Sequence, residues 1–345
     1  MTTTHRVRVE LGSRSYDVIV GRGAIRELSQ VIPSDAKRVA VVTQASLSID
    51  VRDHLPRGLA VTRHLVGDGE QHKSLATIEQ LCSEFAAAGL TRNDVVLGVG
   101  GGMVTDVAGF AAASWHRGIR VVHVSTTLVG MIDAAIGGKT GVNIAAGKNL
   151  VGAFWQPSGV VCDTAFLDTL PAREQRCGNG EMAKYHFLTG DDLLALDLDA
   201  RVARCVQIKA DIVGDDEREA GRRAVLNYGH TLGHALETAT NFSLAHGEAV
   251  AVGMVFAAHL AHALGRIDDA RVAMHHKVIG EHYALRTTPP TGLQRDALIK
   301  LMQRDKKAID GLTFVLDGAN GIETVRDVNL AAVRSEEHTS ELQSH

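Results

Sequence analysis

Residues 95–110, VVLGVGGGMVTDVAGF, and residues 126–154, TTLVGMIDAAIGGKTGVNIAAGKNLVGAF, decide the fold of this chain. The first stretch opens with an apolar run that predicts a buried β-strand. Gly100, Gly101 and Gly102 follow, and an apolar helical segment comes next. A strand that leads through a glycine turn into a helix presents bare backbone N–H groups and the positive end of the helix dipole, and both favour an anion. We therefore expect a phosphate-binding turn, although the pattern departs from GxGxxG and a tight turn without a ligand is the alternative.

The second stretch combines glycines with cationic side chains. Residues 130–152 contain Lys139, Lys148 and Asn149 among their glycines. This composition predicts a glycine-rich loop that places cations beside the nucleotide, where they would bind an anionic substrate. Lysines in such loops are also common as solvated surface charges, which is the alternative interpretation.

Length and composition limit the classes of function. A chain of 345 residues exceeds one typical domain, so we expect two. A net charge of −4 offers no basic footprint for nucleic acid. The cysteines show no CxxC spacing, which argues against a disulfide framework or a thiolate zinc site and favours a reduced, cytoplasmic location. The N-terminal residues lack an apolar signal core, and His259 and His262 interrupt the apolar run at 249–264, so we expect a buried helix and no membrane partner.

The first half of the chain alternates predicted strands and helices. Polar and apolar residues alternate at 6–11 and 16–20, which predicts a β-hairpin. Apolar runs at 38–43, 95–99 and 120–124 predict buried strands separated by helices. This alternation is typical of a doubly wound, mostly parallel sheet, so residues 1–157 are predicted to form a Rossmann-like α/β domain.

The second half is mostly helical. Residues 156–159, QPSG, break the strand pattern, and helical periodicity then dominates up to a strand at 313–316. We predict a mostly α-helical domain at 158–333. The last residues, 334–345 (RSEEHTSELQSH), match the translation of a sequencing adapter. We expect this tail to be non-native and the natural C-terminal sequence to be missing.

Together the motifs resemble those of 3-dehydroquinate synthases. They are GGGxxxDxxGFAAAxxxRG from Gly100, TTL at 126–128, Asp133 followed after five residues by Lys139, and GKN at 147–149. The resemblance implies NAD as cofactor and makes 1–157 the NAD-binding domain. The positions that it implies for cofactor contacts are Glu70, Lys73, Gly100, Gly101, Gly102, Asp106, Thr126, Thr127, Lys139 and Lys148.

The second domain carries candidate metal ligands. His230 and His234 are spaced i, i+4 on a predicted helix, and this spacing alone predicts both as ligands. The resemblance implies a different set, Glu181, His230 and His246, with His234 facing the substrate. One carboxylate and two imidazoles would leave open positions for substrate oxygens on a divalent metal, with zinc or cobalt expected.

The remaining candidate catalytic residues are polar, and their individual roles are implied by the resemblance. From the sequence alone they could be ordinary helix or loop charges. The residues matching the family's substrate shell are Asp133, Lys139, Lys148, Asn149, Lys184, Lys209, Glu219, Arg223, Asn227 and His234. Arg117 matches an arginine that reaches the neighbouring subunit's phosphate site, which implies a homodimer. Either Lys306 or Lys307 matches a phosphate-binding lysine.

The resemblance implies a lyase of the shikimate pathway. Its substrate would be 3-deoxy-D-arabino-heptulosonate 7-phosphate, and its products 3-dehydroquinate and phosphate, with transient oxidation by NAD. Three positions depart from the family pattern: Ser125 replaces a common proline, Gly180 a usual alanine, and Gln44 a smaller acid or amide. The alternatives are another sugar phosphate cyclase of inosose or valiolone type, a metal-dependent polyol dehydrogenase, or an inactive homologue that binds NAD and metal.

Overall fold

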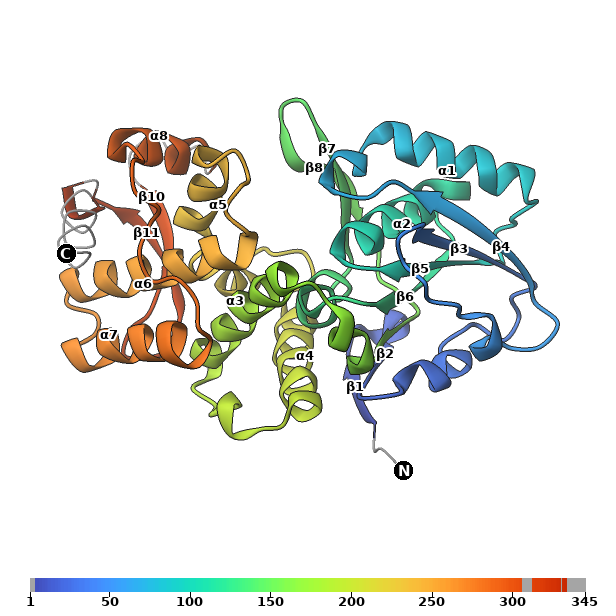
Figure 1. Ribbon diagram of the computed structural model, residues 1–345, viewed down its shortest axis with the longest axis horizontal. Helices are drawn as coiled ribbons and strands as arrows, with labels where there is room; N and C mark the ends of the chain where they lie inside the picture. Colours follow the sequence, from blue (N-terminus) through green and yellow to red (C-terminus); the bar gives the residue numbers. More distant parts are fainter. Residues whose placement is uncertain (1–3, 306–311, 330, 334–345) are drawn as a thin grey trace. The chain divides into compact units, whose positions relative to one another are not determined.

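The chain forms two compact units (Figure 1). The first comprises Met1–Leu170 and Leu196–Arg218, and the second comprises Pro171–Ala195 and Glu219–His345. The computed structural model describes residues 4–305, 312–329 and 331–333. Lys306, Lys307 and the tail at 334–345 lie outside the described residues.

The boundary predicted at residue 157 is wrong. Strand β9 (Gly159–Cys162) belongs to the first unit because it pairs in parallel with β2 (Tyr16–Val20) on one side and β6 (Arg120–Ser125) on the other. Helix α4 (Leu198–Asp215) also belongs to this unit, where it packs against β1 (His5–Val9). The first unit therefore continues past the expected boundary and takes one helix from later in the chain.

A seven-stranded sheet in the order β1-β2-β9-β6-β5-β3-β4 forms the centre of the first unit (Figure 1). Strand β1 is antiparallel to β2, as the predicted hairpin requires, and the remaining pairs are parallel. The chain adds β4 on one side of β3 and then places β5 on the other, so the strand order reverses between β3 and β5. Ligands of doubly wound sheets bind at such a reversal, beside the carboxyl ends of the strands. The strands are β1 (His5–Val9), β2 (Tyr16–Val20), β3 (Arg38–Gln44), β4 (Ala60–Val66), β5 (Val95–Gly100), β6 (Arg120–Ser125) and β9.

Both faces of this sheet are covered, which explains its nearly continuous apolar strands. Val39 and Val41 of β3 pack with the short 3-10 segment η2 (Ala24–Gln30) on one face. Ala40 and Val42 face the other way, toward helices α1 (Leu75–Ala87) and α2 (Gly102–Ser114). The predicted Rossmann-like domain is confirmed by this arrangement.

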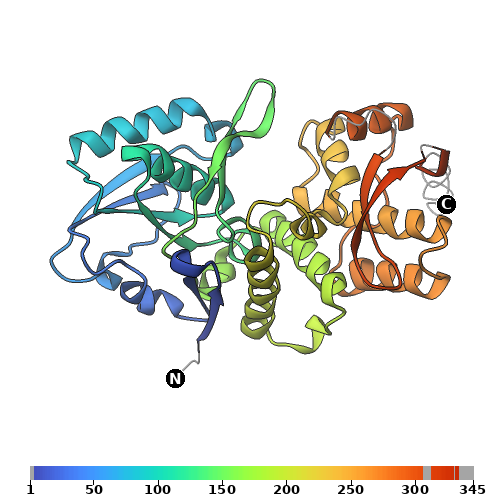
Figure 2. The same ribbon diagram turned by 180° about the vertical axis from the view of Figure 1, so that it is seen from behind.

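The glycine-rich stretch predicted as a loop is a β-hairpin. Strands β7 (Lys139–Ile144) and β8 (Gly147–Phe154) pair antiparallel, and Figure 2 shows the hairpin projecting from the first unit. Gly141 and Gly152 face each other across it, and a Cβ on Gly152 would lie 2.0 Å from the Thr140 carbonyl oxygen. The glycines thus permit close pairing of two strands. A π-helical turn, η6 (Gly130–Ala134), precedes the hairpin.

The second unit is mostly helical, as predicted. Its central helix, α6, is buried on nearly every side, which matches the apolar run at 249–264. Among the described residues, no helix has both the length and the apolar character needed to cross a bilayer. The helices are α3 (Ala172–Thr189), α5 (His230–Ala239), α6 (His246–Ala263), α7 (Asp269–His276) and α8 (Arg295–Asp305), and an antiparallel hairpin joins β10 (Leu312–Leu316) to β11 (Glu323–Val328).

Candidate active site

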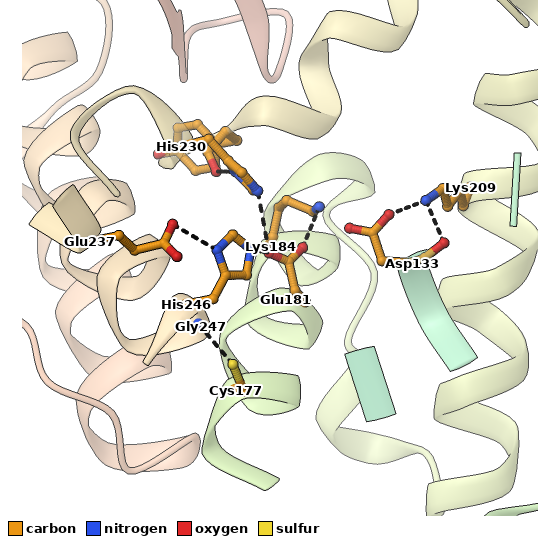
Figure 3. Close-up of polar contacts among 10 residues, drawn as sticks. Asp133, Cys177, Glu181, Lys184, Lys209, His230, Glu237, His246 and Gly247 are labelled. Carbon is orange, nitrogen blue, oxygen red and sulfur yellow. Dashed lines mark hydrogen bonds and ion pairs between the residues drawn. The ribbon is translucent and has the colours of Figure 1, made fainter. Parts of the chain in front are cut away.

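Glu181, His230 and His246 lie together in the second unit, although they are far apart in the sequence (Figure 3). Among the described residues they form the one group of three or more candidate metal-ligand side chains, with ligand atoms within 4.8 Å of one another. Glu181 Oε1 lies 3.1 Å from His246 Nε2 and 3.3 Å from His230 Nε2. In a tetrahedral site with bonds of about 2.0–2.1 Å, neighbouring ligand atoms are about 3.3 Å apart. The spacing of these atoms fits a divalent ion.

Close helix packing brings the three ligands together. Each ligand is adjacent in sequence to a glycine at a helix contact. A Cβ on Gly180, beside Glu181, would lie 2.1 Å from the carbonyl oxygen of Gly247, beside His246. Likewise, a Cβ on Gly229, beside His230, would lie 2.7 Å from the Val250 carbonyl oxygen of α6. Helices α3 and α5 can therefore approach α6 only because these positions lack side chains.

Hydrogen bonds fix which nitrogen of each histidine faces Glu181. His230 Nδ1 lies 3.1 Å from the backbone oxygen of Tyr228, and His246 Nδ1 lies 3.1 Å from Glu237 Oε2. A carbonyl and a carboxylate can only accept, so Nδ1 carries the hydrogen in both rings. The Nε2 atoms are directed at Glu181 (Figure 3), as in metal-ligating histidines whose other nitrogen is hydrogen-bonded.

Burial and neighbouring charges shift the pKa of each of the three side chains. Burial would raise the pKa of Glu181, but the charge of Lys184 and contact with His230 outweigh it and keep this pKa well below its ordinary value. Burial lowers the pKa of His230, and Glu181 only partly offsets this. Burial also opposes the charge of His246, but hydrogen bonds to Glu181 and Glu237 raise its pKa well above the usual range. Thus the ionised form of Glu181 and the neutral form of His230 are favoured, and positive charge is stabilised at His246.

His234 is not a member of this group, so the ligand prediction made from i, i+4 spacing alone is wrong. Its exposed ring lies 5.4 Å from that of His230 and 6.3 Å from that of His246, centroid to centroid. His230, by contrast, is the first residue of α5 and directs Nε2 at Glu181. The side chain of His234 is near the ligands and accessible to solvent.

Four other residues of the second unit were predicted to contact the substrate, and they lie on or before the helices that carry Glu181 and His230. Lys184 Nζ lies 2.5 Å from Glu181 Oε2, one helical turn away and fully buried. Arg223 is also buried, in the 3-10 segment η9 (Arg222–Asn227). Asn227 donates to Glu219 Oε1 at 2.9 Å, and Glu219 has a φ of 59°. Left-handed backbone at a non-glycine residue is a strain often found at functional positions.

In the first unit, the predicted strand–turn–helix is confirmed. Strand β5 ends at Gly100, Gly101 is the N-cap, and α2 begins at Gly102, so the first N–H groups of α2 lie at the end of β5. Thr126 follows β6 and donates its N–H to the Gly100 carbonyl at 3.0 Å. A Cβ on Gly101 would lie 2.8 Å from the Thr127 methyl group. The turn is beside the strand-order reversal, where a nucleotide phosphate is expected.

Lys73 is the centre of a polar network beside this turn. Its Nζ lies 2.6 Å from Asp106 Oδ2 of α2, 3.9 Å from Glu70 Oε1, and contacts the side chain of Asn149 on β8. Asn143 links the same elements, since it donates to Glu70 at 2.8 Å and accepts from the Asn149 N–H at 2.9 Å. Burial raises the pKa of Asp106 to about 6, and Lys73 partly opposes this shift. Four residues predicted from the sequence therefore lie together: Glu70, Lys73, Asp106 and Asn149. Asn143 is a fifth member of the network, and the sequence did not indicate it.

The remaining predicted residues of the first unit form separate features. Lys209, buried on α4, is ion-paired with Asp133 and donates to its backbone oxygen at 2.7 Å (Figure 3). Lys139 and Lys148 are exposed on the β7–β8 hairpin. Arg117 is exposed in the turn after α2 and has a φ of 63°.

The sequence of this chain is similar to those of known proteins over most of its length. A protein provisionally named aminodehydroquinate synthase, from Amycolatopsis mediterranei, is 51% identical over 95% of this chain and 92% of its own length. A 3-dehydroquinate synthase from Saccharopolyspora erythraea is 46% identical over 92% of this chain and 90% of its own length.

Solved structures of sugar phosphate cyclases share the fold. A 2-deoxy-scyllo-inosose synthase, solved with carbaglucose-6-phosphate, NAD+ and Co2+, covers 97% of this chain and 100% of its own, with a TM-score of 0.87 and 24% identity. The 2-epi-5-epi-valiolone synthase of Streptomyces hygroscopicus, solved with NAD+ and Zn2+, has a TM-score of 0.81, 26% identity, and coverage of 97% and 99%. The fold is thus that of a sugar phosphate cyclase.

The family follows from the family models and the relatives. The 3-dehydroquinate synthase N-terminal model matches residues 63–177, and the 3-dehydroquinate synthase C-terminal model matches residues 158–308. The chain belongs to the 3-dehydroquinate synthase family.

Proposed function

We propose that this chain converts 3-deoxy-D-arabino-heptulosonate 7-phosphate to 3-dehydroquinate and phosphate. The observation that carries the proposal is the group of Glu181, His230 and His246 in a chain of this family. A carboxylate and two imidazoles leave coordination positions open for substrate, which is the arrangement of a catalytic rather than a structural metal site.

NAD and a divalent metal, zinc or cobalt, are the proposed cofactors. Both related cyclase structures contain NAD+ with Co2+ or Zn2+. When bound, NAD would take and return a hydride at a secondary alcohol, while the metal would polarise the oxygen there. In this chain the N–H groups at the start of α2 would hold the nucleotide phosphates, and Lys73 would add a cation beside them.

The substrate carries a carboxylate and a phosphate, so it needs several cations. We assign this role to Lys184 and Arg223 in the second unit, and to Lys139, Lys148 and Lys209 in the first. Lysine ammonium groups bind such anions as point charges, whereas the planar guanidinium of Arg223 suits a carboxylate. These cations would also stabilise negative charge that develops as phosphate leaves.

The remaining polar residues would orient the substrate. A hydrogen bond holds Asn227 and Glu219 together, and both would contact substrate hydroxyl groups. Glu219 and the exposed His234 would transfer protons. Asp133 would orient Lys209. Arg117 is proposed to reach the phosphate site of a second subunit in a homodimer, and we expect this biosynthetic enzyme in the cytoplasm.

A second candidate reaction is the formation of aminodehydroquinate. The relative bearing that name is 51% identical to this chain, against 46% for the dehydroquinate synthase from Saccharopolyspora erythraea. The two candidates differ in one substituent of the substrate, so they share the nucleotide turn, the metal group and the phosphate cations. An inosose or valiolone reaction is less favoured, since those cyclases are 24% and 26% identical to this chain.

The test offers the purified chain, with NAD and Zn2+ or Co2+, three substrates in separate reactions. They are the heptulosonate phosphate, its amino analogue, and glucose 6-phosphate. We expect the first substrate to be converted to phosphate and 3-dehydroquinate with the highest kcat/KM of the three. Faster turnover of the amino analogue would favour the second candidate, and a carbocycle formed from the hexose phosphate would favour an inosose synthase. NAD and metal binding without turnover of any of the three would exclude all three reactions.

A further inference from the structure

Glu237 lies behind a metal ligand rather than among the ligands. It is a buried residue of α5, and its Oε2 accepts a hydrogen bond from His246 Nδ1 at 3.1 Å (Figure 3). The opposite nitrogen of the same ring, Nε2, faces Glu181 at 3.1 Å. One imidazole therefore lies between two carboxylates, of which Glu181 belongs to the ligand group and Glu237 does not.

We propose that Glu237 is a positioning residue that prepares His246 to bind the divalent metal. The inference rests on the proposed function only in assuming that Glu181, His230 and His246 hold such an ion. A free imidazole exists in two tautomers and can rotate about its Cβ bond. A carboxylate acceptor at Nδ1 selects the tautomer with a lone pair on Nε2, holds the ring plane, and makes Nε2 a stronger donor to a metal.

The two histidine ligands are supported differently. His230 donates to a neutral backbone carbonyl, that of Tyr228, whereas His246 donates to a charged side chain. The His246 ring is also less buried, with 32% of its side chain exposed against 11% for His230. The more exposed ring has more freedom to turn away, and it is the one held by a carboxylate. Loss of Glu237 is therefore expected to affect metal binding more than loss of an ordinary ion pair.

Helix α5 links the two ligands through this residue. His230 and Glu237 are seven residues apart, so they lie two turns apart on one face of α5. The helix thus provides one ligand directly and orients the other, which begins α6. Any movement of α5 along α6 would change both ligands together.

The experiment compares Glu237→Ala and Glu237→Gln with Glu248→Gln as the matched control. Glu248 is also an acidic residue near His246, but it pairs with Arg176 at 3.1 Å and does not belong to the ligand group. The dissociation constants of Zn2+ and Co2+ are measured by chelator competition, without NAD or substrate. The absorption spectrum of bound Co2+ is recorded as a readout of ligand geometry, and thermal unfolding checks the fold.

We expect Glu237→Ala to weaken metal binding about 10–100-fold and to alter the Co2+ spectrum. Glu237→Gln should bind more tightly than the alanine variant, because its amide oxygen can still accept from Nδ1, but less tightly than wild type. Glu248→Gln should match wild type. A folded Glu237→Ala protein with wild-type affinity would overturn the inference, and if that variant does not fold, wild-type affinity in Glu237→Gln would do so. Absence of tight metal binding in the wild-type protein would instead refute the metal group of the proposed function.

Discussion

Gly180→Ala is expected to separate the metal ligands without changing any of them. The added Cβ would lie 2.1 Å from the Gly247 carbonyl oxygen and 2.5 Å from the Gly247 Cα, both backbone atoms that cannot rotate away. Restoring an ordinary contact of 3.4 Å requires α3 and α6 to separate by about 1.3 Å at this point. Since Glu181 and His246 are the neighbouring residues, their ligand atoms, now 3.1 Å apart, would move to about 4.4 Å.

That separation is too large for one ion to bind both side chains. With bonds of about 2.0–2.1 Å, two ligand atoms can be at most about 4.2 Å apart. Metal affinity should therefore fall at least tenfold, which corresponds to about 1.4 kcal/mol. Overpacking should also lower the free energy of unfolding by about 1–3 kcal/mol.

The assay is chelator competition for Zn2+, combined with urea unfolding of the metal-free protein. Asn179→Ala is the control, because it also introduces an alanine on α3 but adds no atom toward α6. Wild-type zinc affinity in a folded Gly180→Ala protein would show that the glycine contact does not set the spacing of the candidate ligands. The result would also decide whether glycine at this position is a requirement of this chain.

Three further predictions concern the first unit. Lys139→Ala should abolish phosphate release while the chain still unfolds cooperatively on heating, because the variant loses an exposed cation of the hairpin; near wild-type turnover would exclude this lysine from the substrate site. Lys73→Met should weaken NAD binding at least tenfold in a titration calorimeter, since it removes the buried cation beside the glycine turn, whereas the exposed Lys277→Met should bind NAD as wild type does. Burial lowers the pKa of His123 to about 4 from an ordinary 6.5, so the unfolded chain binds a proton that the folded chain does not, and stability is lost as pH falls from 6.5 toward 4. The free energy of unfolding of His123→Leu should therefore fall by about 3 kcal/mol less than that of wild type as pH is lowered from 6.5 to 4. The free energy of unfolding of both proteins is measured at each pH, and parallel pH profiles would contradict the prediction.

Local signals predicted the strand, glycine turn and helix at 95–114, but contacts between distant residues decided several other features. The apolar run at 95–99 and the three glycines after it sufficed to predict β5 and the start of α2. Strand β9, in contrast, is a run of four residues, and only its pairing between β2 and β6 assigns it to the first unit. The β7–β8 hairpin was predicted as a loop because its glycines matter through cross-strand packing, which periodicity does not report.

The candidate metal site shows the same limit. Spacing on one helix favoured His230 and His234, since both lie on one face of α5. The structure groups His230 with Glu181 and His246 instead, and this depends on how α3 and α5 pack on α6. The resemblance to the family provided what spacing could not. The spacing of seven residues places Glu237 on the same helix face as His230, but it does not predict the contact between Glu237 and His246.

A mass balance with NAD well below the substrate concentration tests whether each turnover returns the cofactor to its oxidised form. The heptulosonate phosphate, NAD, Zn2+ and the purified chain are mixed, and phosphate, 3-dehydroquinate and NADH are followed together. For the proposed reaction we expect complete conversion of the substrate, one phosphate for each 3-dehydroquinate, and no net NADH. A reaction that stops when the NAD has been reduced, or NADH that accumulates without phosphate release, would contradict it and indicate a dehydrogenase.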